Sequence, residues 1–85
     1  MGKNKARELQ ETIVQVGLRI AKRGEGALFV IGEVEYSLLI DQSVPPFRAS
    51  ENPKLLESLA LIDGAVIIDK EGIVRAYGAM IKSTH

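Results

Sequence analysis

The pattern of hydrophobic and polar positions predicts a helix and two strands in the first half of the chain. Within residues 5–23, apolar side chains recur at spacings of three and four, at Leu9, Ile13, Val16 and Ile20. This spacing places them on one face of an amphipathic helix, which Gly24 is well placed to end. The apolar run 27–32 then predicts an interior strand, and the alternating segment 33–41 predicts the second arm of a hairpin turning near Gly32.

A loop and a second helix follow. The loop spans residues 42–51 and contains two prolines, which lack the amide donor that a central strand or a helix needs. Asn52 is a typical N-cap residue, and Pro53 suits the first helical position. The short helix that they begin is expected to point Leu55, Leu56 and Leu59 inward.

Two further strands complete the predicted fold. Segment 63–69 is an apolar run with an acid at each end, and segment 73–81 returns after a tight turn in which Gly72 is able to take a positive φ. The order α-β-β-α-β-β predicts an α/β (α+β) fold with a mixed, largely antiparallel sheet and helices packed on it. Because little chain follows Ile81, we expect an unpaired edge there, so that the sheet is incomplete or completed by a partner.

Composition narrows the possible functions. The 85 residues suit one small domain, or the N-terminal part of one, over residues 1–85. Eleven basic residues balance eleven acidic ones, which argues against a nucleic acid partner. The absence of cysteine excludes disulfides, zinc ribbons and thiol nucleophiles. No secretion signal and no apolar run of about 18 residues is present, so we expect a cytoplasmic protein without a membrane partner.

Few residues are candidates for chemistry. His85 is the sole histidine and the last residue, with no motif around it. Asp41 and Asp69 are interpreted as turn formers. A strand of this length holds Asp63 and Asp69 roughly 20 Å apart, which is too far for a carboxylate pair. Asp63 is the best candidate, either as a junction residue that bonds nearby amides or as a carboxylate at the mouth of a pocket.

The sequence around Asp63 resembles the N-terminal half of the diadenylate cyclase domain family. This family occurs in DNA-integrity scanning protein and in archaeal and membrane-linked cyclic di-AMP synthases. "GEGALFVIG" resembles its first strand, and "NPKLLESLALIDGAVIIDKEGIVRAYGAMI" resembles its Leu-rich helix, Asp-Gly-Ala motif and following strands. In the family, two ATP-bound subunits meet face to face, and each ribose 3′-hydroxyl attacks the other nucleotide's α-phosphate. The resemblance therefore implies ATP and a second copy as partners, and Mg²⁺ or Mn²⁺ as the cofactor.

The resemblance also assigns site residues. It implies nucleotide-binding roles for Asp63, Gly64, Ala65, Met80 and Ile81. Asp63 would be the catalytic residue and the metal ligand. Gly64 and Ala65 would be small so that the nucleotide approaches their backbone. Met80 and Ile81 would border the adenine.

Two departures from the family pattern stand beside these matches. Ile62 occupies the position where some members have a histidine as a second metal ligand. The family's second motif, a Gly-Thr-Arg-His run that opens a helix and binds phosphates, does not occur in the 85 residues. The resemblance therefore implies that this chain carries the Asp-Gly-Ala half of the site.

A non-catalytic dimerisation module of the roadblock or profilin-like kind is the alternative. Such modules also carry a hairpin similar to "GAVIIDKEGIVRA" after a helix, with an exposed edge for pairing. This alternative predicts a stable dimer that forms through sheet edges and is indifferent to nucleotide.

Overall fold

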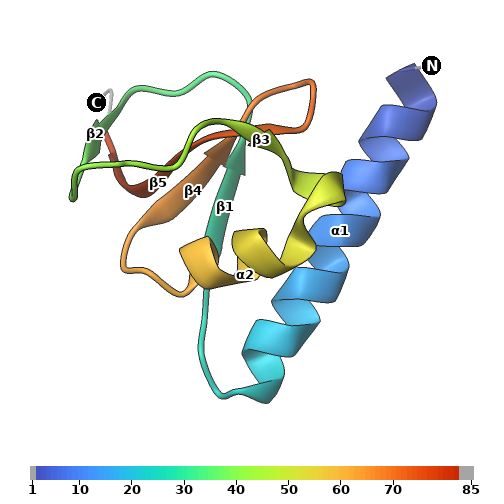
Figure 1. Ribbon diagram of the computed structural model, residues 1–85, viewed down its shortest axis with the longest axis horizontal. Helices are drawn as coiled ribbons and strands as arrows, with labels where there is room; N and C mark the ends of the chain where they lie inside the picture. The colour runs from blue at the N-terminus through green and yellow to red at the C-terminus, as the bar shows by residue number, and fades with distance from the viewer. Residues whose placement is uncertain (1, 83–85) are drawn as a thin grey trace.

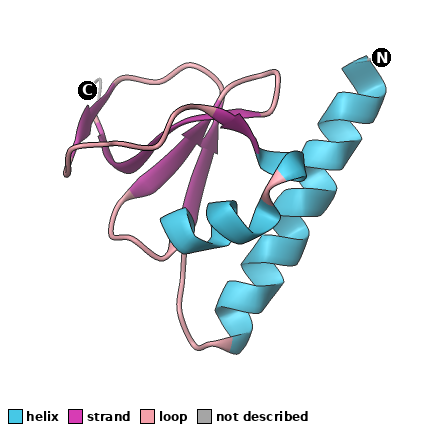
Figure 2. Ribbon diagram, in the orientation of Figure 1, coloured by secondary structure: helices cyan, strands magenta, loops and turns pink. Residues whose placement is uncertain are grey.

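The computed structural model describes residues 2–82 and shows two α-helices and a 3-10 helix packed on a five-stranded sheet (Figures 1 and 2). The elements are α1 (Gly2–Lys22), β1 (Leu28–Ile31), β2 (Tyr36–Leu38), β3 (Phe47–Arg48), η1 (Ala49–Glu51), α2 (Pro53–Ala60), β4 (Ala65–Ile68) and β5 (Ile73–Ile81). The predicted class, a mixed and largely antiparallel sheet with helices packed on it, is confirmed. His85 lies outside the described residues.

Both predicted helices are confirmed, although α1 begins three residues before the predicted start at residue 5. Gly24 ends α1 with a φ of +75°, and its N–H donates to the Ala21 carbonyl at 2.9 Å. At the start of α2, Asn52 Oδ1 accepts the Leu55 N–H at 3.3 Å, with Pro53 at the first helical position. Both ends use the capping that their sequences predict. Neither helix within residues 2–82 is long and apolar enough to cross a membrane.

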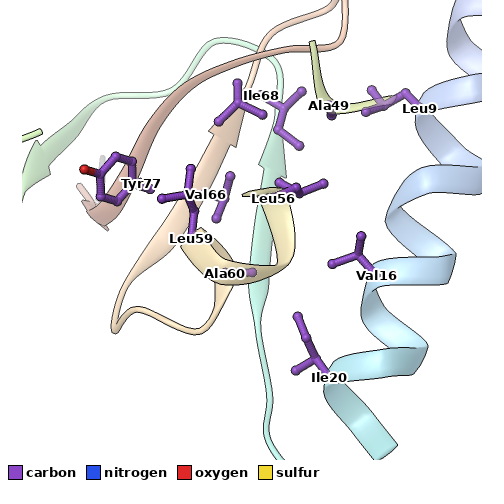
Figure 3. Packing of buried hydrophobic residues seen from close by; sticks show 11 residues of the cluster. Leu9, Val16, Ile20, Ala49, Leu56, Leu59, Ala60, Val66, Ile68 and Tyr77 are labelled. Carbon is purple, nitrogen blue, oxygen red and sulfur yellow. The ribbon is translucent and has the colours of Figure 1, made fainter. Parts of the chain in front are cut away.

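The main core lies between the helices and one face of the sheet (Figure 3). Val16 and Ile20 of α1 and Leu56 of α2 are almost fully buried there. They meet Val66 and Ile68, which lie on the helix-facing side of β4. Burial of such aliphatic side chains is the main stabilising contribution in a domain of this size.

The helix-free face of the sheet has its own smaller core. Ala65, Ile67, Ala76 and Ala79 are buried on it and pack with partly buried Val30, Val34 and Tyr36. All four residues of β4 are therefore buried, which explains why its sequence is continuously apolar instead of alternating.

The predicted hairpin near Gly32 is wrong. β1 pairs in parallel with β4, whereas β2 pairs antiparallel with β5, in the order β1-β4-β5-β2. The Gly32 N–H donates to the Ile68 carbonyl at 2.8 Å, so the chain continues along β4 where a hairpin would turn back. The connection then crosses to the other side of β5. Val34 and Tyr36 alternate because they pack on the helix-free face, not because they face a β1 partner.

The predicted free edge at the last strand is also wrong. β5 pairs with β4 on one side and with β2 and β3 on the other. Its nine residues are long enough to hold two short strands in succession. Among the described strands, β1 forms one edge of the sheet, and β2 and β3 form the other, so the last strand, β5, is internal to the sheet.

Candidate functional site

A pocket of about 620 Å³ opens where α2 leads into β4, beside the start of β1 and the end of β5. Its lining consists of Gly26, Ala27, Leu28, Leu39, Ala60, Leu61, Ile62, Asp63, Gly64, Ala65, Ala79, Met80 and Ile81. All five residues that the sequence singled out are in this set, although they come from two segments about 15 residues apart. The structure therefore brings them together in one pocket.

Sheet register explains why the pocket forms here. Leu28 stands beside Ala65 in the parallel pair, and Ala65 stands beside Ala79 in the antiparallel pair. Both alanines are buried, with exposed fractions of 1% and 2%. Two neighbouring methyl groups on the same face leave space that larger side chains would fill, and they make the floor of the pocket apolar.

Asp63 is exposed and is the single charged residue of the pocket lining. Among the described residues, no hydrogen bond or ion pair engages its carboxylate. The interpretation of Asp63 as a junction residue that bonds nearby amides therefore has no contact to support it. The carboxylate is available to a ligand.

Asp69, at the other end of β4, has the structural role predicted for it. Its Oδ1 accepts the N–H groups of Glu71 at 2.9 Å and Ile73 at 3.0 Å, and its Oδ2 accepts Arg75 Nε at 2.8 Å. Desolvation raises the pKa of Asp69, but the Ile73 amide, the Arg75 side chain and the Glu71 amide outweigh it and lower the pKa below its usual value. Gly72 completes the turn with a φ of +83°.

Gly64 is small for a reason that needs no ligand. Its φ is +108°, and a Cβ built on it would lie 2.7 Å from the Gly78 carbonyl carbon and 2.9 Å from the Gly78 Cα. Contacts this short are not tolerated, so glycine is required here by the approach of β5. Ala65 is likewise enclosed in the sheet. The small size of both residues therefore follows from packing, whatever ligand approaches them.

Met80 and Ile81 form an apolar wall at the end of β5. Both are exposed, Met80 by 56% of its surface and Ile81 by 38%. They pair with Ser37 and Tyr36 of β2, so the sheet fixes their backbone while their side chains meet solvent. Tyr77, three residues earlier, is buried in the main core and does not line this pocket.

No group of three or more His, Cys, Asp or Glu residues within residues 2–82 is arranged to hold a metal. A divalent ion at Asp63 would therefore need other oxygens. Mg²⁺ commonly binds through one or two carboxylates together with water and substrate phosphates, so a single exposed aspartate fits that mode of binding.

Sequence reasoning missed Leu39 and Gly78, which are far from the Asp-Gly-Ala motif along the chain. A signal for the pocket was nevertheless present. The dipeptide Gly-Ala occurs at residues 26–27, 64–65 and 78–79, and five of these six residues line the pocket. The sixth, Gly78, lies against Gly64.

Together, the fold and the pocket define a small α/β domain with a pocket at the end of its sheet. A sequence model of the family described as "DAC: DisA bacterial checkpoint controller nucleotide-binding" matches residues 15–85, and the chain belongs to this family of nucleotide-binding domains. The matched range contains every residue of the pocket lining. No curated protein and no solved structure matches the chain.

Proposed function

We propose that the pocket beside Asp63 binds the adenosine part of ATP and that the chain is a diadenylate cyclase-like domain. The observation that carries this proposal is the convergence of residues 63–65 with Met80 and Ile81 in one pocket of the matched range. A volume of about 620 Å³ lies within the range of small-molecule sites.

The chemistry of the lining supports a nucleoside. Its apolar floor and walls suit the faces of a flat purine ring, and the Asp63 carboxylate is an acceptor for a ribose hydroxyl or a ligand for a cation. No Lys, Arg or His is among the lining residues described. Phosphate binding therefore requires groups other than these, which agrees with the separate phosphate motif of the diadenylate cyclase family.

A divalent ion, Mg²⁺ or Mn²⁺, completes the proposed site. When bound, it neutralises phosphate charge and favours ionisation of the ribose hydroxyl. Asp63 would hold this ion together with phosphate oxygens of the nucleotide. Gly64 and Ala65, fixed by the sheet, keep Asp63 at the pocket, and Met80 and Ile81 exclude water from the base.

The proposed reaction joins two ATP molecules across two copies of the domain that meet face to face. Each ribose 3′-oxygen forms a bond to the α-phosphorus of the opposite nucleotide, and the bond between that phosphorus and the β-phosphate bridging oxygen breaks. Two pyrophosphates leave, two hydroxyl protons are released, and cyclic di-AMP is the product. Asp63 is the residue of this chain proposed to act in the step.

Calorimetry of this protein with ATP and Mg²⁺ or Mn²⁺ tests the binding proposal, with GTP as the competing purine nucleotide. We expect metal-dependent binding of ATP that Asp63→Asn weakens. Cyclic di-AMP formation is then measured on a protein that also carries the phosphate motif, where Asp63→Asn should abolish the product. Absence of ATP binding in the wild-type chain would refute the proposal. A dimer that light scattering finds unchanged by ATP would favour the dimerisation module instead.

A further inference from the structure

The Tyr77–Gly78 bulge of β5 lies next to the Asp-Gly-Ala motif. Between the pairs Ala65↔Ala79 and Ile67↔Ala76, β4 advances by two residues and β5 by three. The extra residue on β5 is accommodated where Gly78 takes a φ of +59°. A bulge of this kind turns backbone groups away from the regular ladder, so they need other partners.

Those partners come from residues 39–42, which we call the 39–42 segment. The Leu39 N–H donates to the Gly78 carbonyl at 2.7 Å, and Gln42 Nε2 donates to the Tyr77 carbonyl. Gln42 is half-buried, and the hydrogen bond of its side chain joins residues 35 positions apart in sequence. The 39–42 segment is thus hydrogen-bonded to both carbonyl groups of the bulge.

Gly78 is enclosed between this segment and the Asp-Gly-Ala motif. A Cβ built on Gly78 would lie 3.2 Å from Ile40 Cγ1 and 3.6 Å from the Asp63 carbonyl oxygen. On its other side, the Gly78 backbone lies so close to Gly64 that it leaves no room for a Cβ there. Ile40, Gly78 and the backbone of residues 63–64 therefore form one continuous stack with no side chain at either glycine.

The same segment reaches the pocket directly, because Leu39 is part of the pocket lining. A displacement of the 39–42 segment would move this wall. It would also release the Gly78 bulge, against which Gly64 rests. Both effects reach the lining of the same pocket, one through Leu39 and the other through Gly64.

We propose that the 39–42 segment sets the position of Asp63 and Gly64, and that Gln42 is a positioning residue for the nucleotide pocket. Gln42 does not line the pocket and acts through Tyr77 and Gly78. Its effect on ATP rests on the proposed function, whereas its effect on the Gly64 backbone does not.

The first test is Gln42→Leu, which keeps the side-chain size but removes the amide donor, with Ser43→Ala at the exposed neighbouring position as the control. Without nucleotide, NMR measures the amide chemical shifts of Gly64 and Gly78. It also measures amide hydrogen exchange at Leu39, whose N–H donates to the Gly78 carbonyl, and at Val16 in the core of α1. In Gln42→Leu we expect exchange at Leu39 to rise about tenfold through local opening and the amide chemical shifts of Gly64 and Gly78 to change, while Val16 keeps its protection. Ser43→Ala should change none of them.

ATP affinity is measured on the same samples, and we expect Gln42→Leu to weaken it about threefold to tenfold, in line with the loss of one hydrogen bond. An unchanged amide chemical shift at Gly64 would overturn the proposal. A rise in exchange at Leu39 that is matched at Val16 would also overturn it, because the effect would then be on global stability. Wild-type protein that fails to bind ATP, with the Gly64 amide chemical shift still changed in the variant, would refute the proposed function and leave the positioning role standing.

A second pair of variants separates the effect of backbone strain at a substituted glycine from the effect of contact with the 39–42 segment. Gly78→Ala and Gly72→Ala both place a Cβ at a positive φ, +59° and +83°. The nearest atom to a Cβ at Gly72 is Arg48 Nη1 at 3.8 Å, so only the Gly78 variant presses on Ile40 and, through it, on the 39–42 segment. We expect the NMR chemical shift of the Gly64 amide and the affinity for ATP to change in Gly78→Ala alone. Equal changes in both variants would contradict the proposal.

Discussion

Gly64 lies so close to Gly78 that a Cβ on Gly64 would stand 2.7 Å from the Gly78 carbonyl carbon. The glycine of the Asp-Gly-Ala motif is therefore part of the contact between β5 and the start of β4. This contact holds Asp63 at the pocket, since Asp63 immediately precedes Gly64. Gly64 therefore belongs both to the packing of the sheet and to the pocket, so its substitution tests both.

Gly64→Ala should destabilise the domain by roughly 2–4 kcal/mol, because it combines a positive φ with overpacking against a backbone that cannot move aside. Denaturant unfolding followed by circular dichroism measures this change. Gly17→Ala is the matched control, because Gly17 is in α1 and nothing lies within 4 Å of a Cβ built on it. That change should stabilise the protein by about 0.5–1 kcal/mol through helix propensity. A Gly64→Ala variant as stable as wild type would contradict the close contact.

Asp63→Asn and Asp69→Asn should have opposite effects. Asp63 has no polar partner within the described residues, so its substitution should change stability by less than about 0.5 kcal/mol. It should weaken metal-dependent ATP binding about tenfold or more, because an amide lacks the charge that a cation needs. Asp69→Asn should lower stability by roughly 0.5–1.5 kcal/mol, through loss of the Arg75 pair, and leave ATP binding unchanged.

Stability and ATP affinity should be measured on the same samples, by thermal unfolding and by calorimetry. Unaltered ATP affinity in Asp63→Asn would remove Asp63 from the site. A stability loss in that variant comparable with the loss in Asp69→Asn would restore its interpretation as a junction residue.

The contribution of Asp69 to stability should depend on pH. Folding lowers the pKa of this carboxyl group, so the folded state favours its ionised form. The contribution is therefore fully present above the unfolded pKa of about 3.9 and is lost as the pH falls through the lower folded pKa. The difference in unfolding free energy between wild type and Asp69→Asn should shrink below about pH 4. Urea titrations at pH 7, 4 and 2.5 measure it, and a difference that grows on acidification would contradict the assignment.

Features decided within a few residues were predicted correctly from the sequence. Asn52 caps α2, Gly24 ends α1, and Asp69 and Gly72 form the turn between β4 and β5. Each of these depends on hydrogen bonds between near neighbours in the chain. Local sequence therefore carries the information that specifies them.

Strand pairing was less accessible to prediction because its partners are distant in sequence. Residues 27–41 have the alternation of a hairpin, but β1 finds its partner 37 residues later, at Leu28↔Ala65. The side chains of Val34 and Tyr36 satisfy the same alternation by packing on the helix-free face. Local pattern alone does not distinguish these two ways of burying alternate residues.

The candidate site was found in part. Asp63, Gly64 and Ala65 form a contiguous motif, and the pocket contains them. Leu39 was missed because it enters through the pairing of β2 with β5, which the predicted hairpin excluded. The sequence explained the small size of Gly64 by the approach of a nucleotide, and this explanation was incomplete. The close contact of Gly64 with Gly78 depends on a bulge in β5 that the local sequence pattern does not predict.

Met80→Ala tests the apolar wall of the pocket. Met80 is 56% exposed, so its truncation should cost less than about 0.5 kcal/mol of stability. If Met80 covers the adenine, the lost apolar contact should weaken ATP binding by about 1 kcal/mol, or roughly fivefold, which is part of the value of burying a whole methionine side chain. Val14→Ala is the matched control, because Val14 is 53% exposed on α1 and does not line this pocket. Calorimetric titration of ATP into both variants measures the effect. Equal affinities for the two variants would show that the nucleotide does not contact the β5 wall and would move the proposed adenine position to another part of the pocket.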